Sequence, residues 1–132
     1  MAVLTTAPAT RVALAEAVAD PTRITVVAFC AAWCDTCAQF RATYERIAAA
    51  RSQASFVWLD IEDDEAVAGD VEVENFPTLA IYHGAVPLFF GISLPHELTV
   101  ARLCDAYAAS RVPMTDPPAA VSALPGLLAA KG

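Results

Sequence analysis

Residues 24–37 read ITVVAFCAAWCDTC, and this stretch decides the fold. Ile24 to Cys30 is β-branched and almost wholly apolar, which is typical of a strand buried on both faces. A helical pattern starts at Cys34 and runs to about residue 50, with one apolar stripe formed by Phe40, Tyr44, Ile47 and Ala48. The sequence therefore predicts a buried strand that leads almost directly into a helix carrying Cys34 and Cys37 at its start.

The spacing Cys34-x-x-Cys37 is that of a redox pair or of half a zinc site. A zinc site needs further ligands, and neither Cys104 nor the two histidines have the spacing for it. Cys30 extends the pattern to C-x3-C-x2-C, which some iron–sulfur enzymes use, but those enzymes are far larger than this chain. The redox pair is the interpretation that remains, and it requires no metal.

The position of the pair supports thiol–disulfide exchange. A helix N-terminus presents unpaired N–H groups and a partial positive charge, and both favour the thiolate at Cys34. Cys37 lies one turn further along and is more shielded. We expect Cys34 to attack a substrate disulfide as the nucleophile and Cys37 to resolve the mixed disulfide.

On either side of this stretch, the pattern predicts a short edge strand at 3–6 and strands at 55–61, 78–82 and 86–90. It also predicts a helix at 11–19, a charged turn or short helix at 62–70, and a helix at 95–110 with Pro95 in its first turn. Strands joined through helices imply parallel neighbours, and the short link at 83–85 implies an antiparallel hairpin. The predicted class is α/β, with a central mixed sheet of four to five strands and helices on both faces. We expect one domain at 1–111.

The composition changes after Arg111. Residues 112–132 hold four of the nine prolines, and Pro125-Gly126 is expected to break any helix in the apolar segment 121–130. Two alternatives stay open for this tail. It is mobile, or it forms a short helix that docks on the body or on another subunit, which would give a homodimer, because its leucines would otherwise be exposed.

Charge and hydropathy exclude several classes of protein. The 132 residues carry 15 carboxylates against 8 cations, a net charge of -7, which is the wrong sign for a nucleic-acid binder. No apolar run approaches the roughly 20 residues of a membrane span. The first ten residues lack a basic residue, and Pro8 interrupts them early, so we expect no signal peptide and a cytoplasmic location. In that compartment a C-x-x-C pair is more often catalytic than structural.

Three motifs then resemble the thioredoxin family. Residues 31–37, AAWCDTC, are similar to that family's active-site segment, usually A-x-W-C-G-P-C. Residues 75–79, NFPTL, resemble its second signature, an apolar residue followed by a cis-proline and threonine, and Gly91 falls where the family has a glycine. The resemblance covers about 3–110. It implies a thioredoxin fold, the reduction of protein disulfides without any cofactor, and a thioredoxin reductase as the source of electrons.

The resemblance also implies a substrate surface. In the family the cis-proline, here Pro77, packs beside the dithiol, and the backbone of the preceding residue, here Phe76, pairs with the substrate like an added strand. Trp33, Phe76, Gly91 and Ile92 would then surround Cys34 with apolar surface.

Two departures from the family pattern bear on reactivity. Asp35 and Thr36 replace Gly-Pro between the cysteines; the carboxylate disfavours the neighbouring thiolate, and Thr36 lacks the stiffness of proline, so both residues should tune the pair. The buried aspartate and lysine of the family match Ala28 and Trp58 here. Cys37 therefore lacks the family's general base, and water or an acidic residue such as Asp60 would have to accept its proton.

Other features leave alternatives open. Cys30 is a small apolar core residue or an auxiliary thiol near the pair, and Cys104 is a packing residue. The loss of the buried Asp–Lys pair also fits a non-catalytic binding module or adaptor that keeps the fold. Eight of the fifteen acidic residues lie at 60–74, and a flanking acidic loop would favour basic partners.

Overall fold

The computed structural model describes residues 3–130. Its elements are β1 (Val3–Leu4), α1 (Arg11–Ala19), β2 (Ile24–Cys30), α2 (Asp35–Ala49), β3 (Ala54–Asp60), α3 (Glu65–Ala68), β4 (Thr78–His83), β5 (Val86–Ile92), α4 (Glu97–Ser110) and α5 (Ala119–Ala129). The order agrees with the predicted one, and α5 is added at its end. Residues 1–2 of the predicted domain and 131–132 of the predicted tail lie outside the described residues.

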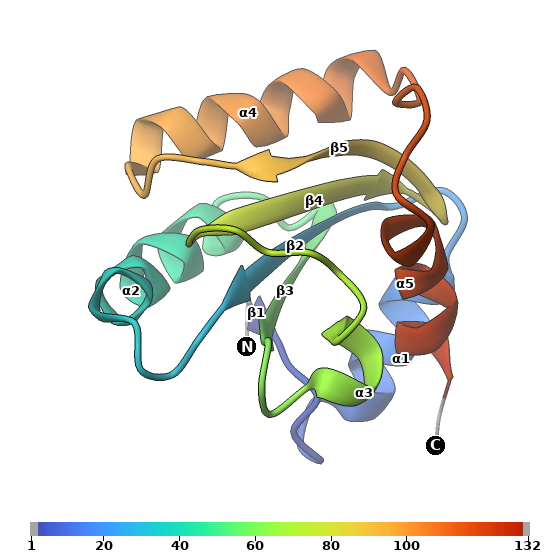
Figure 1. Ribbon diagram of the computed structural model, residues 1–132. Helices are drawn as coiled ribbons and strands as arrows, with labels where there is room; N and C mark the ends of the chain where they lie inside the picture. The colour runs from blue at the N-terminus through green and yellow to red at the C-terminus, as the bar shows by residue number, and fades with distance from the viewer. Residues whose placement is uncertain (1–2, 131–132) are drawn as a thin grey trace.

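The sheet is mixed and has five strands in the order β1-β3-β2-β4-β5 (Figure 1). β3 runs parallel to both β1 and β2, whereas β4 is antiparallel to β2 and to β5. β2 is central and buried along its whole length, as its continuous apolar sequence predicts. The central strand therefore delivers the cysteine segment to one edge of the sheet.

Two apolar layers cover the sheet. The helices α2 and α4 lie on one face, and α1, α3 and α5 lie on the other (Figure 1). Because side chains alternate along a strand, Val26 and Ala28 of β2 face α2, while Val27 and Phe29 face the opposite layer. Cys30 continues the series that faces α2.

Tyr44 fixes α2 against the sheet. Its side chain is fully buried, and its hydroxyl lies 2.9 Å from the carbonyl oxygens of Val26 and Val57, on neighbouring strands. Burial raises the pKa of this hydroxyl well above its ordinary value, so it stays protonated and able to donate. This anchor sets the depth at which the start of α2 meets the end of β2.

The tail docks as a helix on its own chain. α5 packs against α1, and its buried side chains Val121, Leu124 and Leu128 join the apolar layer on that face. Of the three leucines that suggested a docking surface, Leu127 alone stays exposed, at 43%. Within the described residues, the tail leucines are therefore covered mainly by the same chain.

The expectation that Pro125-Gly126 breaks a helix was wrong, because α5 continues through both residues to Ala129. The carbonyl groups at the end of this helix also have hydrogen-bond donors. The guanidinium of Arg11 donates hydrogen bonds to the carbonyl oxygens of Leu128 (2.8 Å) and Ala130 (2.6 Å). A cation at a helix C-terminus binds the carbonyl groups that lack helical donors.

The last predicted helix begins later than expected. His96 is the N-cap of α4, so Pro95 precedes the helix instead of lying in its first turn. Two ion pairs hold α4, one between Glu97 and Arg46 of α2 and one between Asp105 and Arg51, which follows the end of α2. Across residues 3–130, none of the helices combines the length and the apolar character needed to cross a bilayer.

Candidate active site

Cys34 occupies the N-cap of α2, directly after the turn that follows β2. Its N–H donates to the carbonyl of Ala31 (3.1 Å), and its own carbonyl accepts the N–H of Ala38 (3.1 Å), the first bond of the helix. Its side chain is partly exposed, whereas Cys37, three residues further along, is 1% exposed. One accessible and one shielded cysteine at a helix start is the arrangement that the sequence predicts.

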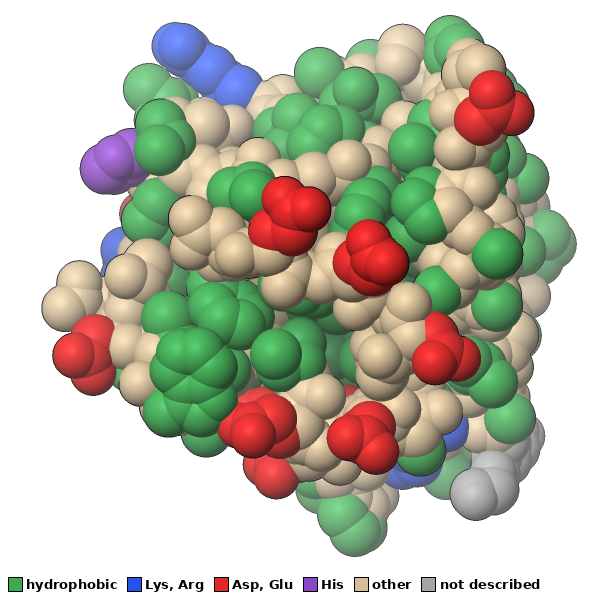
Figure 2. All heavy atoms as spheres, viewed as in Figure 1, with side chains coloured by type: hydrophobic (Ala, Val, Ile, Leu, Met, Phe, Trp, Pro, Cys, Tyr) green, Lys and Arg blue, Asp and Glu red, His purple; other side chains and the backbone are tan. Residues whose placement is uncertain are grey.

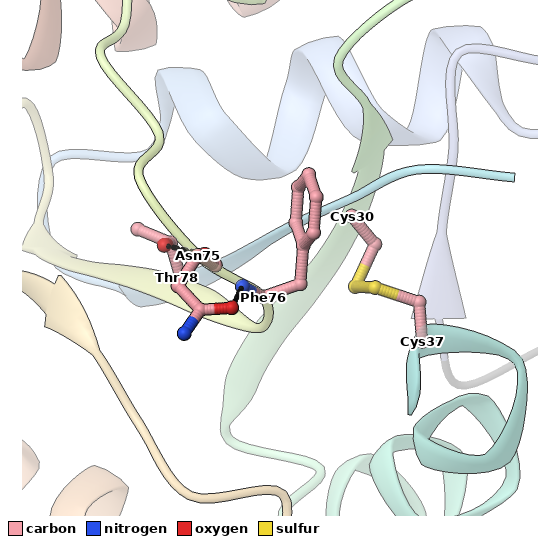
Figure 3. Close-up of a disulfide and its surroundings, with 5 residues drawn as sticks. All are labelled: Cys30, Cys37, Asn75, Phe76 and Thr78. Atoms are coloured by element: carbon pink, nitrogen blue, oxygen red, sulfur yellow. Dashed lines mark hydrogen bonds between the residues drawn. A yellow bond between two sulfur atoms is a disulfide. The ribbon is translucent and has the colours of Figure 1, made fainter. Parts of the chain in front are cut away.

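The disulfide, however, does not join these two cysteines. Cys37 is bonded to Cys30, with their Cα atoms 5.8 Å apart (Figure 3). Cys34 is free. Both bonded residues are 1% exposed. The interpretation of Cys30 as a mere packing residue is therefore wrong. The alternation of β2 carries the signal for this contact, since it turns Cys30, like Ala28, toward α2.

Trp33 lies on the surface beside the predicted substrate loop. Its side chain is 66% exposed, and its ring meets that of Phe76 edge to face, with centroids 5.5 Å apart. The indole Nε1–H donates to Oε1 of Glu62 over 2.7 Å. These two contacts orient an exposed aromatic ring next to Cys34.

The loop before β4 is built by local hydrogen bonds. The Phe76–Pro77 peptide bond is cis. Oδ1 of Asn75 accepts the Phe76 N–H (2.8 Å), and the Thr78 hydroxyl donates to the Asn75 carbonyl (2.6 Å) (Figure 3). The Pro77 carbonyl accepts the N–H of Ser93 (3.1 Å), which ties the loop to the end of β5. Because the Phe76 N–H is already bound, a substrate strand that uses it must displace the Asn75 side chain.

Gly91 and Ile92 border this loop from β5. They pair with Leu79 and Thr78 of β4, and Ile92 is 52% exposed. Both residues also line a hollow of about 520 Å³, whose other walls are the acidic segment 70–74, Thr78, Phe90 and residues 118–120 at the start of α5. The predicted substrate residues thus lie on two sides of Pro77. Gly91 and Ile92 of β5 are on one side, and the Trp33–Phe76 contact is on the other.

Acidic side chains surround apolar ones on the face that includes α3 and the loop before β4. Figure 2 shows several carboxylates set among hydrophobic side chains there, with few basic groups. Glu62 at Trp33 and Asp70, Glu72 and Glu74 at the hollow belong to the acidic run at 60–74. The acidic loop therefore flanks the candidate site, as the sequence hypothesis requires.

An aromatic side chain fills the place of the missing ion pair. Ala28 and Trp58 are direct register partners on β2 and β3, and Ala28 is fully buried. The Trp58 ring packs on Phe40, and the Arg41 guanidinium lies 4.9 Å from its centroid. No carboxylate occupies position 28 to accept a proton from Cys37.

Asp60 shares a surface hollow with Cys37, and Asp63 is the second acidic residue that lines it. Asp60 pairs in register with Cys30, and both Asp60 and Cys37 line a surface depression of about 440 Å³. Its Oδ1 accepts the N–H groups of Glu62 (2.8 Å) and Asp63 (2.9 Å). These bonds fix the carboxylate at the end of β3, on the side of the sheet that carries the cysteines.

The remaining predicted residues lie as follows. Asp35 and Thr36 are the exposed first residues of α2. Cys104 is free and buried, and burial raises its pKa to about 12, so it is a protonated packing residue at neutral pH. Among residues 3–130, no cluster of three or more His, Cys, Asp or Glu side chains is placed to hold a metal ion.

Comparison with known proteins points to one family. The family model described as Thioredoxin matches residues 5–88. The chain is 37% identical to thioredoxin-2 of Saccharomyces cerevisiae over 69 residues, which is 52% of this chain and 66% of that protein. It is 32% identical to mouse thioredoxin over 60 residues, 46% of this chain and 57% of the relative. The chain thus spans somewhat less than two thirds of the length of these relatives.

Solved structures show the same fold at lower identity. The thioredoxin of Fasciola hepatica superposes with a TM-score of 0.64 at 22% identity and covers 80% of this chain and 98% of its own. A mutant thioredoxin of Halobacterium salinarum gives a TM-score of 0.64 at 20% identity, covering 80% and 90%. These superpositions show that the chain has the same fold as these structures.

Proposed function

Because the chain belongs to the thioredoxin family, we propose that it is a thiol–disulfide oxidoreductase that reduces protein disulfides. The observation that carries the proposal is the placement of Cys34. Its partly exposed side chain lies at the N-terminus of α2, next to Trp33, whose ring contacts the loop of the cis Phe76–Pro77 bond. In this proposal Cys34 is the nucleophile, Cys37 one turn away is the resolving cysteine, and the aromatic surface beside Cys34 receives the polypeptide.

The reaction consists of two exchanges. The Cys34 thiolate attacks one sulfur of the substrate disulfide, a mixed disulfide forms, and the first substrate thiolate leaves. The Cys37 thiolate then attacks the Cys34 sulfur, which forms the Cys34–Cys37 disulfide and releases the second substrate thiolate. The substrate gains two electrons, and the pair loses two. A thioredoxin reductase, the partner implied by the family, would restore the dithiol.

The second exchange lacks the family's buried base. Ala28 cannot take the Cys37 proton, and the fixed carboxylate of Asp60 or water is the acceptor that we propose. Loss of a positioned base slows a proton transfer by about a hundredfold or more. We therefore expect resolution of the mixed disulfide to limit the rate.

Five residues are proposed to hold the substrate. Trp33 and Phe76 supply an aromatic pair, and the exposed Ile92 extends the apolar surface along β5. Gly91 has no side chain that would project from this surface. Pro77 sets the direction of the loop. An extended substrate segment would add next to Phe76 in the manner of an added strand.

Asp35 and Thr36 are proposed to tune the pair. The Asp35 carboxylate follows Cys34 directly and opposes the attraction of the helix start for the thiolate. Its exposure keeps this opposition small because solvent and salt screen it. Thr36 leaves the first turn of α2 less constrained than the proline of the family does.

The acidic surroundings favour basic substrates. With a net charge of -7 and carboxylates at Glu62, Asp70, Glu72 and Glu74 around the apolar surface, approach of a cationic protein is accelerated and that of an anionic one is slowed. A reducing compartment such as the cytoplasm is the setting that we propose, because the dithiol form must be regenerated there.

A non-catalytic binding module is the alternative. The replacement of the buried ion pair by Trp58 favours it, since an adaptor does not need a base for Cys37. A measured reduction potential separates the two functions. A reductase has a potential in the range of cellular thiol carriers, about -270 mV for thioredoxin itself, whereas the cysteines of an adaptor are not oxidised and reduced in that range.

The test is the reduction of insulin disulfides with dithiothreitol as the electron source. We expect the protein to accelerate the reaction over dithiothreitol alone, Cys34→Ser to abolish the acceleration, and Cys104→Ser, a buried cysteine outside the site, to preserve it. A protein that adds nothing to the rate with dithiothreitol, while folded by circular dichroism, would contradict the proposal.

A further inference from the structure

Three cysteines, not two, meet at the end of β2. Cys30 is the last residue of the strand and faces α2, Cys34 is the N-cap of that helix, and Cys37 is bonded to Cys30 and lies one helical turn after Cys34. Residues at positions i and i+3 of a helix start lie on one side of it, so Cys34 is a second neighbour of Cys37 besides Cys30.

We infer that Cys30 is a third exchange cysteine, and that the oxidised protein moves its disulfide from Cys34–Cys37 to Cys30–Cys37. This inference rests on the proposed function, since that function forms the Cys34–Cys37 bond. In the transfer, the Cys30 thiolate attacks the Cys37 sulfur, the bond between Cys37 and Cys34 breaks, and Cys34 leaves as a thiolate. One disulfide is lost and one is formed, so no oxidant or reductant is needed, and the proton given up by Cys30 is balanced by the one that Cys34 takes up.

The transfer changes what a partner can reach. Both sulfurs of the Cys30–Cys37 bond belong to residues that are 1% exposed, whereas Cys34 is partly exposed and carries the free thiol. An external thiol reaches an exposed disulfide far more readily than a buried one. The oxidised protein thus stores its disulfide out of reach of large partners and again presents Cys34 as a nucleophile.

The return path uses the same sulfurs. The Cys34 thiolate attacks Cys37, which restores the exposed Cys34–Cys37 disulfide and releases Cys30. Reduction by a protein partner then requires this step first, and Cys34 is the only route by which such a partner reaches the stored oxidising equivalents. Cys30 touches the reacting sulfur and so belongs to the catalytic residues.

The spacing of the backbones fits this exchange. The Cα atoms of Cys30 and Cys37 are 5.8 Å apart, inside the range of about 4.4–6.8 Å that native disulfides occupy. The strand and the helix therefore need no rearrangement to hold the bond. Tyr44 fixes α2 against β2 and maintains this separation.

Disulfide mapping tests the inference without any substrate. The oxidised protein is unfolded at low pH, its free thiols are alkylated, and it is cut with chymotrypsin, which cleaves after aromatic residues. Cleavage after Trp33 separates Cys30 from the fragment that holds Cys34 and Cys37. We expect the two fragments to be linked and the label to sit on Cys34. Unlinked fragments with the label on Cys30 would overturn the inference, whether or not the protein reduces insulin.

Two variants sharpen the result. Oxidised Cys34→Ser should contain the Cys30–Cys37 disulfide and lose all labelling at those two positions; labelling of both would show that Cys30 does not take part. Cys30→Ala should leave the Cys34–Cys37 disulfide and no label on either cysteine. The matched control Cys104→Ser, a second buried cysteine, should give the wild-type map. Because Cys34 is on the surface, its variant keeps the test valid even if Cys30→Ala fails to fold.

Discussion

The hydroxyl of Tyr82 donates a 2.8 Å hydrogen bond to the carbonyl oxygen of Val121, and this carbonyl is the one that Pro125 leaves without a helical donor. In an α-helix the carbonyl at 121 accepts the N–H at 125, and proline has none. A side chain of β4 therefore repairs the helix that the sequence predicts to be broken at Pro125. The repair also ties α5 to the sheet.

Tyr82→Phe should destabilise the protein by about 1–2 kcal/mol, because it leaves a buried carbonyl without a partner. Urea unfolding measures this change. Tyr107→Phe, a half-buried tyrosine on the other face, is the control and should change the unfolding free energy by less than about 0.5 kcal/mol. Adding Pro125→Ala restores the N–H at 125 and should recover most of the loss; strict additivity of the two changes would rule out the repair.

Ending the chain at Arg111 should cost about 5 kcal/mol or more, since burial of Val121, Leu124 and Leu128 contributes about 1.5–3 kcal/mol each. The exposed layer around Leu14 should then promote self-association. Sedimentation of both proteins checks this expectation. A full-length chain that dimerises while the shortened chain stays monomeric would favour the tail-mediated homodimer instead.

Stability should fall as the pH rises from about 9 to about 12. Burial raises the pKa of Cys104 to about 12 from its ordinary value of 9.0, so over this range the unfolded chain has lost a proton that the folded chain retains. Each such group lowers the unfolding free energy by about 1.4 kcal/mol per pH unit. Burial also raises the pKa of Tyr44 and Tyr82, and these groups add to the fall at the upper end.

Cys104→Ala should flatten this decline between about pH 9 and the point where the tyrosines begin to titrate. Urea unfolding at a series of alkaline pH values provides the slope. An unchanged slope would mean that Cys104 ionises in the folded chain as easily as in the unfolded one.

Glu62→Ala should raise the KM for protein disulfides about two- to fivefold with little change in kcat, because the indole of Trp33 loses the charged acceptor that orients it. Trp33→Ala should have a larger effect in the same direction. Glu16→Ala removes an exposed carboxylate on α1 and serves as the control for net charge. If Glu16→Ala raises KM equally, long-range charge and not the orientation of Trp33 is the cause.

Ala28→Asp should destabilise the protein by about 3 kcal/mol or more near neutral pH, because a lone buried carboxylate has no lysine beside it. Burial raises the pKa of such a carboxyl above its unfolded value, so the loss grows with rising pH and shrinks with falling pH. Ala28→Asn has the same shape without the charge and should show no such dependence. Equal stability of both variants from weakly acidic to alkaline pH would contradict this account.

The sequence by itself determined the sheet and the start of the site. The apolar run of β2 can be satisfied only by burial on both faces, and the short link between β4 and β5 permits little but a hairpin, so element order and strand directions follow locally. The placement of Cys34 at a helix start follows from the same run, and so does the shielding of Cys37.

Only the tertiary structure decided which groups bond to one another. Cys37 bonds to Cys30 because a strand and a helix pack at a particular depth, which Tyr44 sets, and nothing in the spacing of the three cysteines selects one bond over the other. Likewise, Pro125 is harmful to a helix in isolation, and only the hydroxyl of Tyr82, 43 residues earlier in the chain, removes that cost by supplying the missing donor. Local patterns fix which groups need a partner, whereas packing fixes which partner they find.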